Sequence, residues 1–318
     1  MTAKTKLLRT VVPDAVRSVR KRARRTLVRL RLKLTGADQN TRLQAERMLR
    51  GRERFDTLQK ADAVIVSYPK CGRTWLRVMI SRLFQQIYNL PEDVVVDFDN
   101  FHLMDRRIPK ILFTHDDFIR EYTGNLQTKA DYYDKKVILL VRDPRDVAVS
   151  LFFHRRYRSD PWKNDMNGFP PQEHMETVFD FVQHEGGLPR IIDFMNLWAR
   201  DRENVRDLML LAYENMRADP STALTEVARF LDLPATEEQI REAVAYASFE
   251  NMKKKEADQA FGMSGNRLAP GDKDNPDSYK VRRAKVGGYR DYFDDAQIAT
   301  IDRLIAERLD PVYGYARS

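Results

Sequence analysis

The chain has 318 residues, of which 42% are apolar and 32% charged, with a net charge of +8. This length and apolar content suit one large α/β domain with a sizeable core. The single cysteine excludes an internal disulfide framework, and no segment approaches the roughly 18 consecutive apolar residues of a membrane span. Since no apolar signal region precedes a cleavage site either, we predict a cytoplasmic protein.

The first 36 residues form a separate basic segment. They contain twelve Lys or Arg and one acid, Asp14, so their net charge is +11 and the remaining residues sum to −3. Apolar residues interleave with the arginines over 16–34, which favours either an amphipathic helix on an anionic membrane surface or a solvated, disordered tail. The slightly acidic remainder is not expected to bind nucleic acid. We therefore predict a leader over 1–36 and a folded domain over 37–318.

The stretch 62–80, DAVIVSYPKCGRTWLRVMI, predicts a strand, a short basic turn and a helix in that order. Residues 63–66 are apolar and mostly β-branched, as in a buried strand. Apolar residues then recur at helical spacing over 75–88. The turn therefore lies where a strand meets the N-terminus of a helix, a place that attracts anions through unpaired N–H groups and the helix dipole.

The residues of this turn strengthen its expected affinity for anions. Lys70 and Arg73 bring full positive charges to the helix N-terminus. Gly72 allows the backbone to approach an anion closely, and Thr74 adds a hydroxyl donor. The lysine precedes the only glycine, so the turn differs from the ATP- and GTP-binding pattern GxxxxGK[ST].

Three further apolar segments, 110–113, 136–141 and 208–212, predict strands whose ends lead into His115, Arg142 and Tyr213. Strands that alternate with helices favour a doubly wound, mostly parallel sheet, in which ligands bind beyond the carboxyl ends of the strands. We therefore expect Lys70 and the three strand-end residues to converge. The helices that separate the strands are predicted over 75–88, 144–157, 189–204 and 220–232.

A second anion-binding element follows Arg142 in the segment RDPRDVAVS. Asp143 suits the N-cap of the next helix and Pro144 suits its first position. Ser150 then lies about two turns into this helix, where it can face back toward the turn at Lys70.

Three segments together resemble the motifs of the sulfotransferase family. YPKCGRTW keeps six of the eight positions of the family's 5′-phosphosulfate loop, YPKSGTTW. RDPRDVAVS resembles its 3′-phosphate motif, an arginine followed eight residues later by a serine. RRAKVGGYRDYF, residues 282–293, resembles its RKGxxGDWKNHF pattern. The resemblance implies the family's P-loop-kinase-like α/β fold, a central mostly parallel sheet flanked by helices.

The resemblance also implies the co-substrate, 3′-phosphoadenosine 5′-phosphosulfate (PAPS), with no metal. Adenine would stack on Trp75, helped by the YENM segment with Tyr213 and Met216 and by the ASF segment with Phe249. The implied cofactor-binding residues are Lys70, Cys71, Gly72, Arg73, Thr74, Trp75, Arg142, Ser150, Tyr213, Phe249, Arg282 and Arg283.

Catalytic roles implied by the resemblance fall on Lys70, His115 and Ser150. His115 stands in FTHDD where the family has KTH, and histidine suits a base because its pKa lies near neutrality. Lys70 would stabilise the leaving group, and Ser150 would restrain Lys70 until the acceptor binds. Either Asp116 or Asp117 is a candidate to orient the imidazole ring.

Several positions depart from the family pattern. Cys71 replaces a serine, and a thiol at a helix N-terminus beside cations is expected to have a lowered pKa and to be oxidisable. Arg73 replaces a threonine, and Phe113 replaces the lysine of KTH, so Arg73 is a candidate to restore the lost charge. Near the C-terminus, Ala284 and Gly288 replace a glycine and an aspartate.

The acceptor is not defined by the sequence. Two long irregular segments, 155–189 and 253–281, are expected to flank its pocket. A hydroxyl or an amine on a lipid, a glycan or a small alcohol or phenol remains open, with the basic leader favouring a membrane-associated acceptor. Two other classes also stay open: a magnesium-dependent phosphoryl-transfer enzyme, and a nucleotide-binding protein without catalytic activity.

Overall fold

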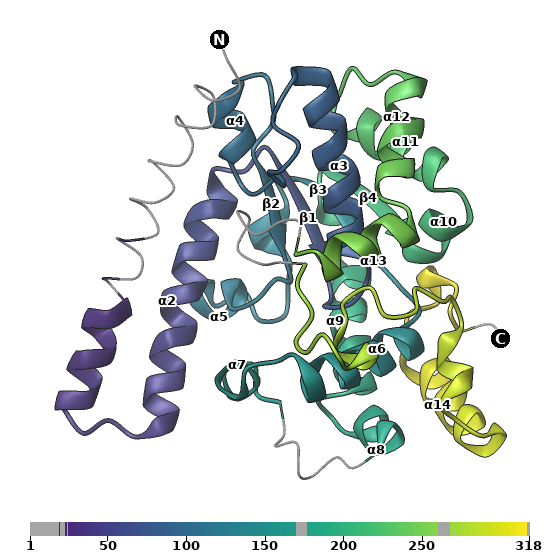
Figure 1. The fold of residues 1–318 in the computed structure, drawn as a ribbon. Helices are drawn as coiled ribbons and strands as arrows, with labels where there is room; N and C mark the ends of the chain where they lie inside the picture. Colours follow the sequence, from purple (N-terminus) through teal and green to yellow (C-terminus); the bar gives the residue numbers. More distant parts are fainter. Residues whose placement is uncertain (1–18, 20–22, 24, 170–176, 260–267, 317–318) are drawn as a thin grey trace.

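The sheet consists of four parallel strands, β1 (Ala63–Ser67), β2 (Ile111–Thr114), β3 (Lys136–Val141) and β4 (Asp207–Ala212), in the order β2-β1-β3-β4 (Figure 1). The computed structural model describes residues 19, 23, 25–169, 177–259 and 268–316. After β1 the next strand, β2, lies at one edge of the sheet, and after β3 the next strand, β4, lies at the opposite edge. Because crossovers between parallel strands are right-handed, these two connections place their helices on opposite faces of the sheet. The switch point lies between β1 and β3, where doubly wound sheets bind ligands.

The predicted elements agree closely with the observed ones. The four predicted strands are present, and none of their ends differs from the prediction by more than one residue. The helix predicted over 144–157 is α6 (Pro144–Tyr157), with Asp143 as its N-cap and proline in its first turn. The helix predicted over 189–204 ends earlier, as α9 (Leu188–Asp201), and a short 3-10 turn follows it.

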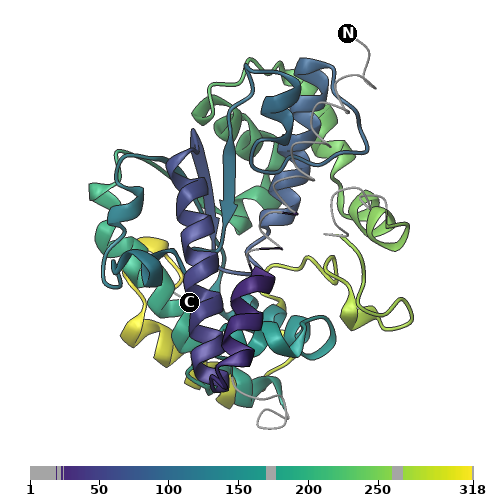
Figure 2. The ribbon, with the colours of Figure 1, turned by 90° about the vertical axis from the view of Figure 1, so that its left-hand side faces the viewer.

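Helices cover both faces of the sheet. On one face α3 (Arg73–Tyr88) packs against α11 (Pro220–Phe230) and α12 (Glu237–Tyr246), and on the other α6 packs against α8 (Val178–Gln183) and α9 (Figures 1 and 2). The other helices labelled in Figure 1 are α2 (Gln39–Gln59), α4 (Asn100–Met104), α5 (Ile119–Thr123), α7 (Pro161–Met166), α10 (Tyr213–Ala218), α13 (Phe249–Ala257) and α14 (Asp295–Arg308).

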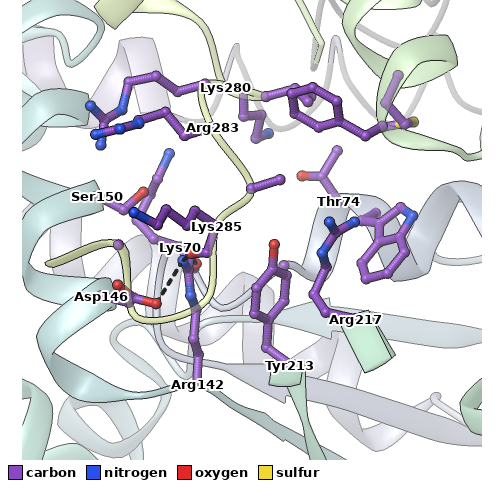
Figure 3. A pocket seen from close by; sticks show the side chains of 18 of the residues that line it. Lys70, Thr74, Arg142, Asp146, Ser150, Tyr213, Arg217, Lys280, Arg283 and Lys285 are labelled. Carbon is purple, nitrogen blue, oxygen red and sulfur yellow. Dashed lines mark hydrogen bonds and ion pairs between the residues drawn. The ribbon is translucent and has the colours of Figure 1, made fainter. Parts of the chain in front are cut away.

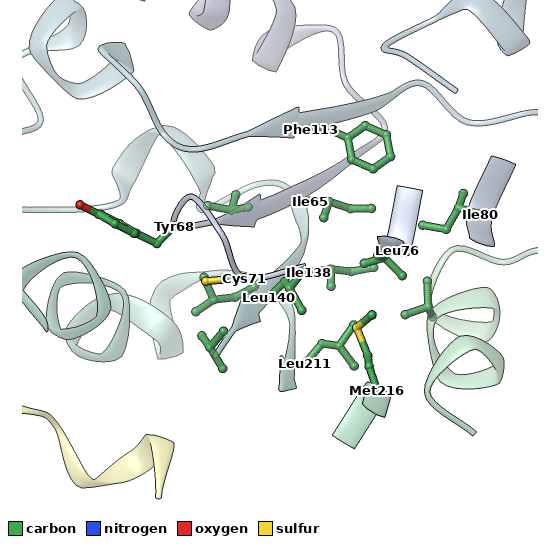
Figure 4. Close-up of a cluster of buried hydrophobic side chains, with 14 of the residues drawn as sticks. Ile65, Tyr68, Cys71, Leu76, Ile80, Phe113, Ile138, Leu140, Leu211 and Met216 are labelled. Carbon is green, nitrogen blue, oxygen red and sulfur yellow. The ribbon is translucent and has the colours of Figure 1, made fainter. Parts of the chain in front are cut away.

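The core lies around the two central strands. Every residue of β1 and all but the first of β3 are buried, as expected for strands covered on both faces. Ile65, Ile138 and Leu140 contact apolar side chains of α3 and α10, among them Leu76 and Met216 (Figure 4). This packing holds the ends of β1 and β3 rigidly beside each other.

The sequence did not predict α2, and for the leader it left an amphipathic helix and a disordered tail open. Residues 25–34 are helical and lie beside α2, joined to it by a short loop (Figure 1). Arg25 pairs with Glu53, and Arg29 pairs with the buried Glu46 at 2.9 Å. Among the described residues, no helix has both the length and the apolar character needed to cross a membrane.

Candidate active site

One cavity, at the carboxyl ends of the strands, contains most of the residues that the sequence singled out (Figure 3). The starts of α3 and α6 and the segment before α14 complete its wall. The predicted residues that line it are Lys70, Gly72, Arg73, Thr74, Trp75, His115, Arg142, Ser150, Tyr213, Phe249, Arg282 and Arg283. Four further charged residues line it without having been predicted: Asp146, Arg217, Lys280 and Lys285.

The turn between β1 and α3 places Lys70 inside this cavity. Lys70 adopts a left-handed backbone conformation (φ 78°), which is uncommon for a residue with a side chain. Burial, together with the nearby charges of Arg158 and Arg142, lowers the pKa of Lys70 to about 7. A bound anion would reverse this effect, because it favours the charged ammonium.

Gly72 is the N-cap of α3 and is also left-handed (φ 93°). A Cβ atom at this position would lie 2.6 Å from the ring of Tyr213. The absence of a side chain therefore lets the helix N-terminus sit directly against the Tyr213 ring.

Arg142 stands at the end of β3 and links the two anion-binding elements. Its guanidinium donates to the Lys70 carbonyl at 3.3 Å and to the Lys285 carbonyl at 3.1 Å, and it pairs with Asp146 at 3.2 Å. It also lies over the Tyr213 ring, 4.4 Å from the centroid. The buried Nε atom of Arg142 has no hydrogen-bond partner among the described residues. A buried cationic donor without a partner is suited to an anionic ligand.

Two buried carboxylates hold the C-terminal basic segment against the cavity. Glu256 accepts hydrogen bonds from the backbone N–H groups of Lys280 at 2.6 Å and Val281 at 2.7 Å. Asp146 accepts from the N–H groups of Gly287 at 3.0 Å and Tyr289 at 2.9 Å. The segment is therefore fastened at both ends, and the basic residues between them line the cavity.

The basic pair between these anchors is held by Tyr292 and by acidic residues. The Tyr292 hydroxyl accepts from both Arg282 and Arg283. Arg283 also pairs with Asp291 at 2.8 Å. Ala284 adopts a left-handed conformation (φ 50°), which a glycine would adopt more easily.

Aromatic residues form the other end of the cavity. The Trp75 indole donates to the Ala247 carbonyl at 2.8 Å and lies edge-on to Tyr213, with 6.0 Å between ring centroids. Arg217 lies over the Trp75 ring at 5.6 Å. Met216, which the sequence also placed beside adenine, is instead fully buried in the core. Met216 and Tyr213 both belong to α10.

The hydrogen bonds of His115 define its tautomer. Its Nε2 lies 2.6 Å from an Arg73 nitrogen, and its Nδ1 lies 2.8 Å from the Ser67 carbonyl oxygen. A guanidinium only donates and a carbonyl only accepts, so Nδ1 carries the proton and Nε2 is the acceptor. Burial and the charge of Arg73 hold the pKa of His115 well below its usual value. His115 is therefore neutral, with its basic nitrogen facing Arg73.

The comparisons agree with this geometry. The sulfotransferase domain family matches residues 60–312. The chain belongs to the sulfotransferase family. Human sulfotransferase 6B1 is 26% identical over 260 residues, covering 78% of this chain and 76% of the relative, and mouse sulfotransferase 2B1 is 26% identical over 275 residues, covering 82% and 75%. The crystal structure of mouse sulfotransferase SULT7A1 complexed with PAP has the same fold, with a TM-score of 0.52, 22% identity and coverage of 80% of this chain and 86% of that one.

Two expectations for this sulfotransferase were wrong. The Cys71 side chain points into the core (Figure 4) and is 3% exposed, and burial raises the pKa of its thiol to about 12, so it is neither acidic nor accessible to oxidants. Neither Asp116 nor Asp117 orients the His115 ring, because the Ser67 carbonyl accepts its Nδ1–H. Asp116 instead accepts hydrogen bonds from Lys129 and Tyr132.

Phe113 stands at the position where the sulfotransferase motif has a lysine. Its ring is buried at the end of β2, and the Arg77 guanidinium lies over it, 3.9 Å from the centroid. Arg77 itself pairs with Asp97 at 3.4 Å. Arg73, at the position where the family has a threonine, is a cation that contacts the His115 imidazole nitrogen.

Among the described residues, no group of three or more His, Cys, Asp or Glu side chains has the arrangement needed to hold a metal ion.

Proposed function

We propose that this sulfotransferase uses PAPS as its donor and transfers the sulfuryl group to a hydroxyl or amine of an acceptor. The observation that carries the proposal is the clustering of Lys70, Arg142, Arg282 and Arg283 around one cavity beside the N-terminus of α3. The unpartnered Nε of Arg142 supports an anionic ligand at this point. The protein with the same fold, mouse SULT7A1, was crystallised with PAP.

The two ends of the cavity suit the two ends of the donor. Arg142, Ser150, Arg282 and Arg283 would hold the 3′-phosphate, since arginine forks match phosphate oxygens. The adenine would lie among the aromatic side chains at the other end. The 5′-phosphosulfate would then meet the turn between β1 and α3, through the residues Lys70, Gly72, Arg73 and Thr74 and the backbone of Cys71.

His115 would act as the general base toward the acceptor. Because its Nδ1–H is fixed on the Ser67 carbonyl, only Nε2 can take a proton. The low pKa of His115 keeps it neutral, so that Nε2 has a lone pair for the acceptor proton once Arg73 no longer occupies it. PAPS supplies a sulfuryl group already activated for transfer, with PAP as the leaving group.

Lys70 would balance the charge that develops on the leaving oxygen. Removing one well-placed charged donor of this kind typically costs about 10²–10³ in rate. Ser150, two turns into α6, would restrain Lys70 between turnovers. Arg73 would restore the positive charge that is lost where Phe113 replaces lysine, once the bound donor draws it away from His115 Nε2.

Calorimetric titration with PAP, and in parallel with ATP–Mg²⁺, tests the donor assignment. We expect PAP to bind in the micromolar range, ATP–Mg²⁺ to bind more weakly, and Arg142→Ala to abolish PAP binding while the protein remains folded. Lys70→Ala should bind PAP more weakly and His115→Ala should bind it normally, and both should lose turnover, which separates an enzyme from a nucleotide-binding protein. A preference for ATP–Mg²⁺ would instead support a phosphoryl-transfer enzyme and overturn the proposal.

We also propose that the leader contacts an anionic membrane surface. Leu27, Leu30 and Leu34 are 68%, 51% and 87% exposed on the leader helix, and Arg31 and Lys33 are exposed beside them. An exposed apolar stripe next to cations is the pattern of an interfacial helix. Sedimentation with phosphatidylserine-containing vesicles tests this proposal, and absence of binding would contradict it.

A further inference from the structure

A second cavity, of about 630 Å³, lies next to the catalytic histidine but outside the donor site. Phe113 and Asp117, which flank His115 in the sequence, both line it. Arg54 of α2 also lines this second cavity, and its charge contributes to the lowered pKa of His115, as does that of Lys280 in the donor cavity. His115 therefore stands between the two cavities. A volume in this range suits a small-molecule ligand.

The second cavity is lined by charges of both signs. Arg54, Asp117 and Lys163 all line it, the first and last exposed and Asp117 half-buried. None of these three side chains has a hydrogen-bond or ion-pair partner in the part of the chain that the structure describes. The Arg25–Glu53 ion pair forms another part of the wall. The lining thus offers both donors and acceptors that are not used by the protein itself.

Such a lining matches hydroxyl groups better than an apolar surface. A hydroxyl both donates and accepts, so it can bond to a carboxylate and to a guanidinium or ammonium at once. An apolar ring packed against the same three groups would remove water from their charges without replacing the lost hydrogen bonds. Phe98, Phe113 and Phe118 also line the cavity and offer apolar surface to the C–H faces of a polyol ring.

We propose that this second cavity is the acceptor site and that the acceptor is polyhydroxylated, of the sugar type, rather than a phenol or a sterol. This inference rests on the proposed function, because it assigns the acceptor of the same reaction. One sugar hydroxyl would reach His115 Nε2 between the cavities, lose its proton to that nitrogen and form a bond to sulfur as the bond from sulfur to the PAP oxygen breaks.

The test measures PAP formation from PAPS with trehalose and methyl α-glucoside as sugar probes and with p-nitrophenol and a sterol as apolar probes. We expect kcat/KM for at least one sugar to exceed that for both apolar probes by about tenfold or more. Saturation-transfer NMR in the presence of PAP gives a second readout of sugar binding that does not depend on turnover.

Variants of α2 provide the matched comparison. Arg54→Gln should raise KM for the sugar, or weaken its NMR signal, by about tenfold without changing the affinity for PAP. Arg52→Gln is the control, because Arg52 is exposed on the same helix and does not line the cavity.

Each outcome separates this inference from the donor assignment. Normal PAP binding with preferred turnover of p-nitrophenol or the sterol overturns the sugar-type acceptor and leaves the proposed donor intact. The sugar-type acceptor is equally overturned if neither sugar is turned over or bound, or if Arg54→Gln behaves as Arg52→Gln does. Loss of PAP binding in the unmodified protein would instead contradict the proposed function itself.

Discussion

Lys70 has a pKa of about 7 because it is buried near Arg158 and Arg142, which disfavour a further positive charge. A bound phosphate or sulfate favours the protonated ammonium and raises this pKa, so binding is coupled to proton uptake. The cationic form is the one that binds, and it is lost from the free protein as the pH rises through the free pKa.

We therefore predict that PAP affinity is nearly constant below about pH 7 and falls between about pH 7 and pH 9, by up to about tenfold per pH unit for one proton. Calorimetry in buffers of different ionisation enthalpy measures the proton uptake directly. In Lys70→Met, PAP affinity should fall less steeply with pH. Lys280, whose pKa is also well lowered, should account for the pH dependence that remains. A pH-independent affinity with no proton uptake would contradict the role of Lys70.

Arg73 shapes the pH dependence of the reaction through its contact with His115. The neutral imidazole is the active form, and the charge of Arg73 helps to hold the pKa of His115 well below its usual value. The acid limb of kcat/KM in the unmodified enzyme should therefore lie at low pH.

Arg73→Thr, which restores the family's residue, should raise the pKa of His115 and move this acid limb to higher pH. It should also lower kcat by about tenfold or more if Arg73 supplies transition-state charge. A pH–rate profile of both proteins tests the two effects separately. An unchanged kcat would argue against the compensating role, and an unmoved acid limb would argue against His115 as the base.

The loop before α14 contains only short 3-10 turns, and two distant carboxylates, Glu256 and Asp146, hold it in position. Asp146 on α6 binds two backbone N–H groups of the loop and pairs with Arg142. An amide in place of the carboxylate would keep the shape but lose the charge and weaken these contacts.

Asp146→Asn should weaken PAP binding by about 10–100-fold, because the loop that presents Arg282 and Arg283 is then poorly held. Hydrogen exchange should rise at the backbone amides of Gly287 and Tyr289. Asp295→Asn, an exposed site at the start of α14, serves as the control and should change neither quantity. Wild-type PAP affinity in Asp146→Asn would show that the loop needs no such anchor.

At the scale of the whole molecule, the leader helix is attached to α2 through arginines, which leaves its leucines facing outward. Arg25 and Arg29 bind Glu53 and Glu46 of α2, while Leu27, Leu30 and Leu34 stay exposed. The leader also forms part of the wall of the second cavity through Arg25. Membrane contact and acceptor binding would thus occur on neighbouring parts of the molecule.

We predict that the protein sediments with phosphatidylserine-containing vesicles, less so at high salt, and not with neutral vesicles. The double variant Leu27→Gln/Leu34→Gln should weaken this binding by about tenfold or more, because two exposed apolar side chains no longer enter the interface. Leu210→Gln is the matched control, since Leu210 is an exposed leucine on β4. If the double variant and Leu210→Gln sediment equally with the vesicles, the exposed leucines of the leader do not mediate membrane contact.

Much of the fold follows from short-range patterns in the sequence. Fully apolar runs such as 136–141 are readable as buried parallel strands because both faces are covered by helices. Capping and proline signals placed α6 correctly because they act within a single helical turn. The anion-binding turn at Lys70 was readable for the same reason: it needs only a strand end, a glycine and a helix N-terminus.

Other features were decided only by tertiary structure, because they join residues that are distant in the chain. Asp146 and Gly287 are 141 positions apart, and nothing in either local sequence marks their hydrogen bond. The acidity of the Cys71 thiol was misjudged because burial, which the local charges do not reveal, outweighs them. The tautomer of His115 depends on Ser67 and Arg73, which β1 and α3 bring to it from 48 and 42 residues away. The sequence by itself determined the strands, the anion-binding motifs and the family, whereas packing decided protonation states, loop anchors and the second cavity.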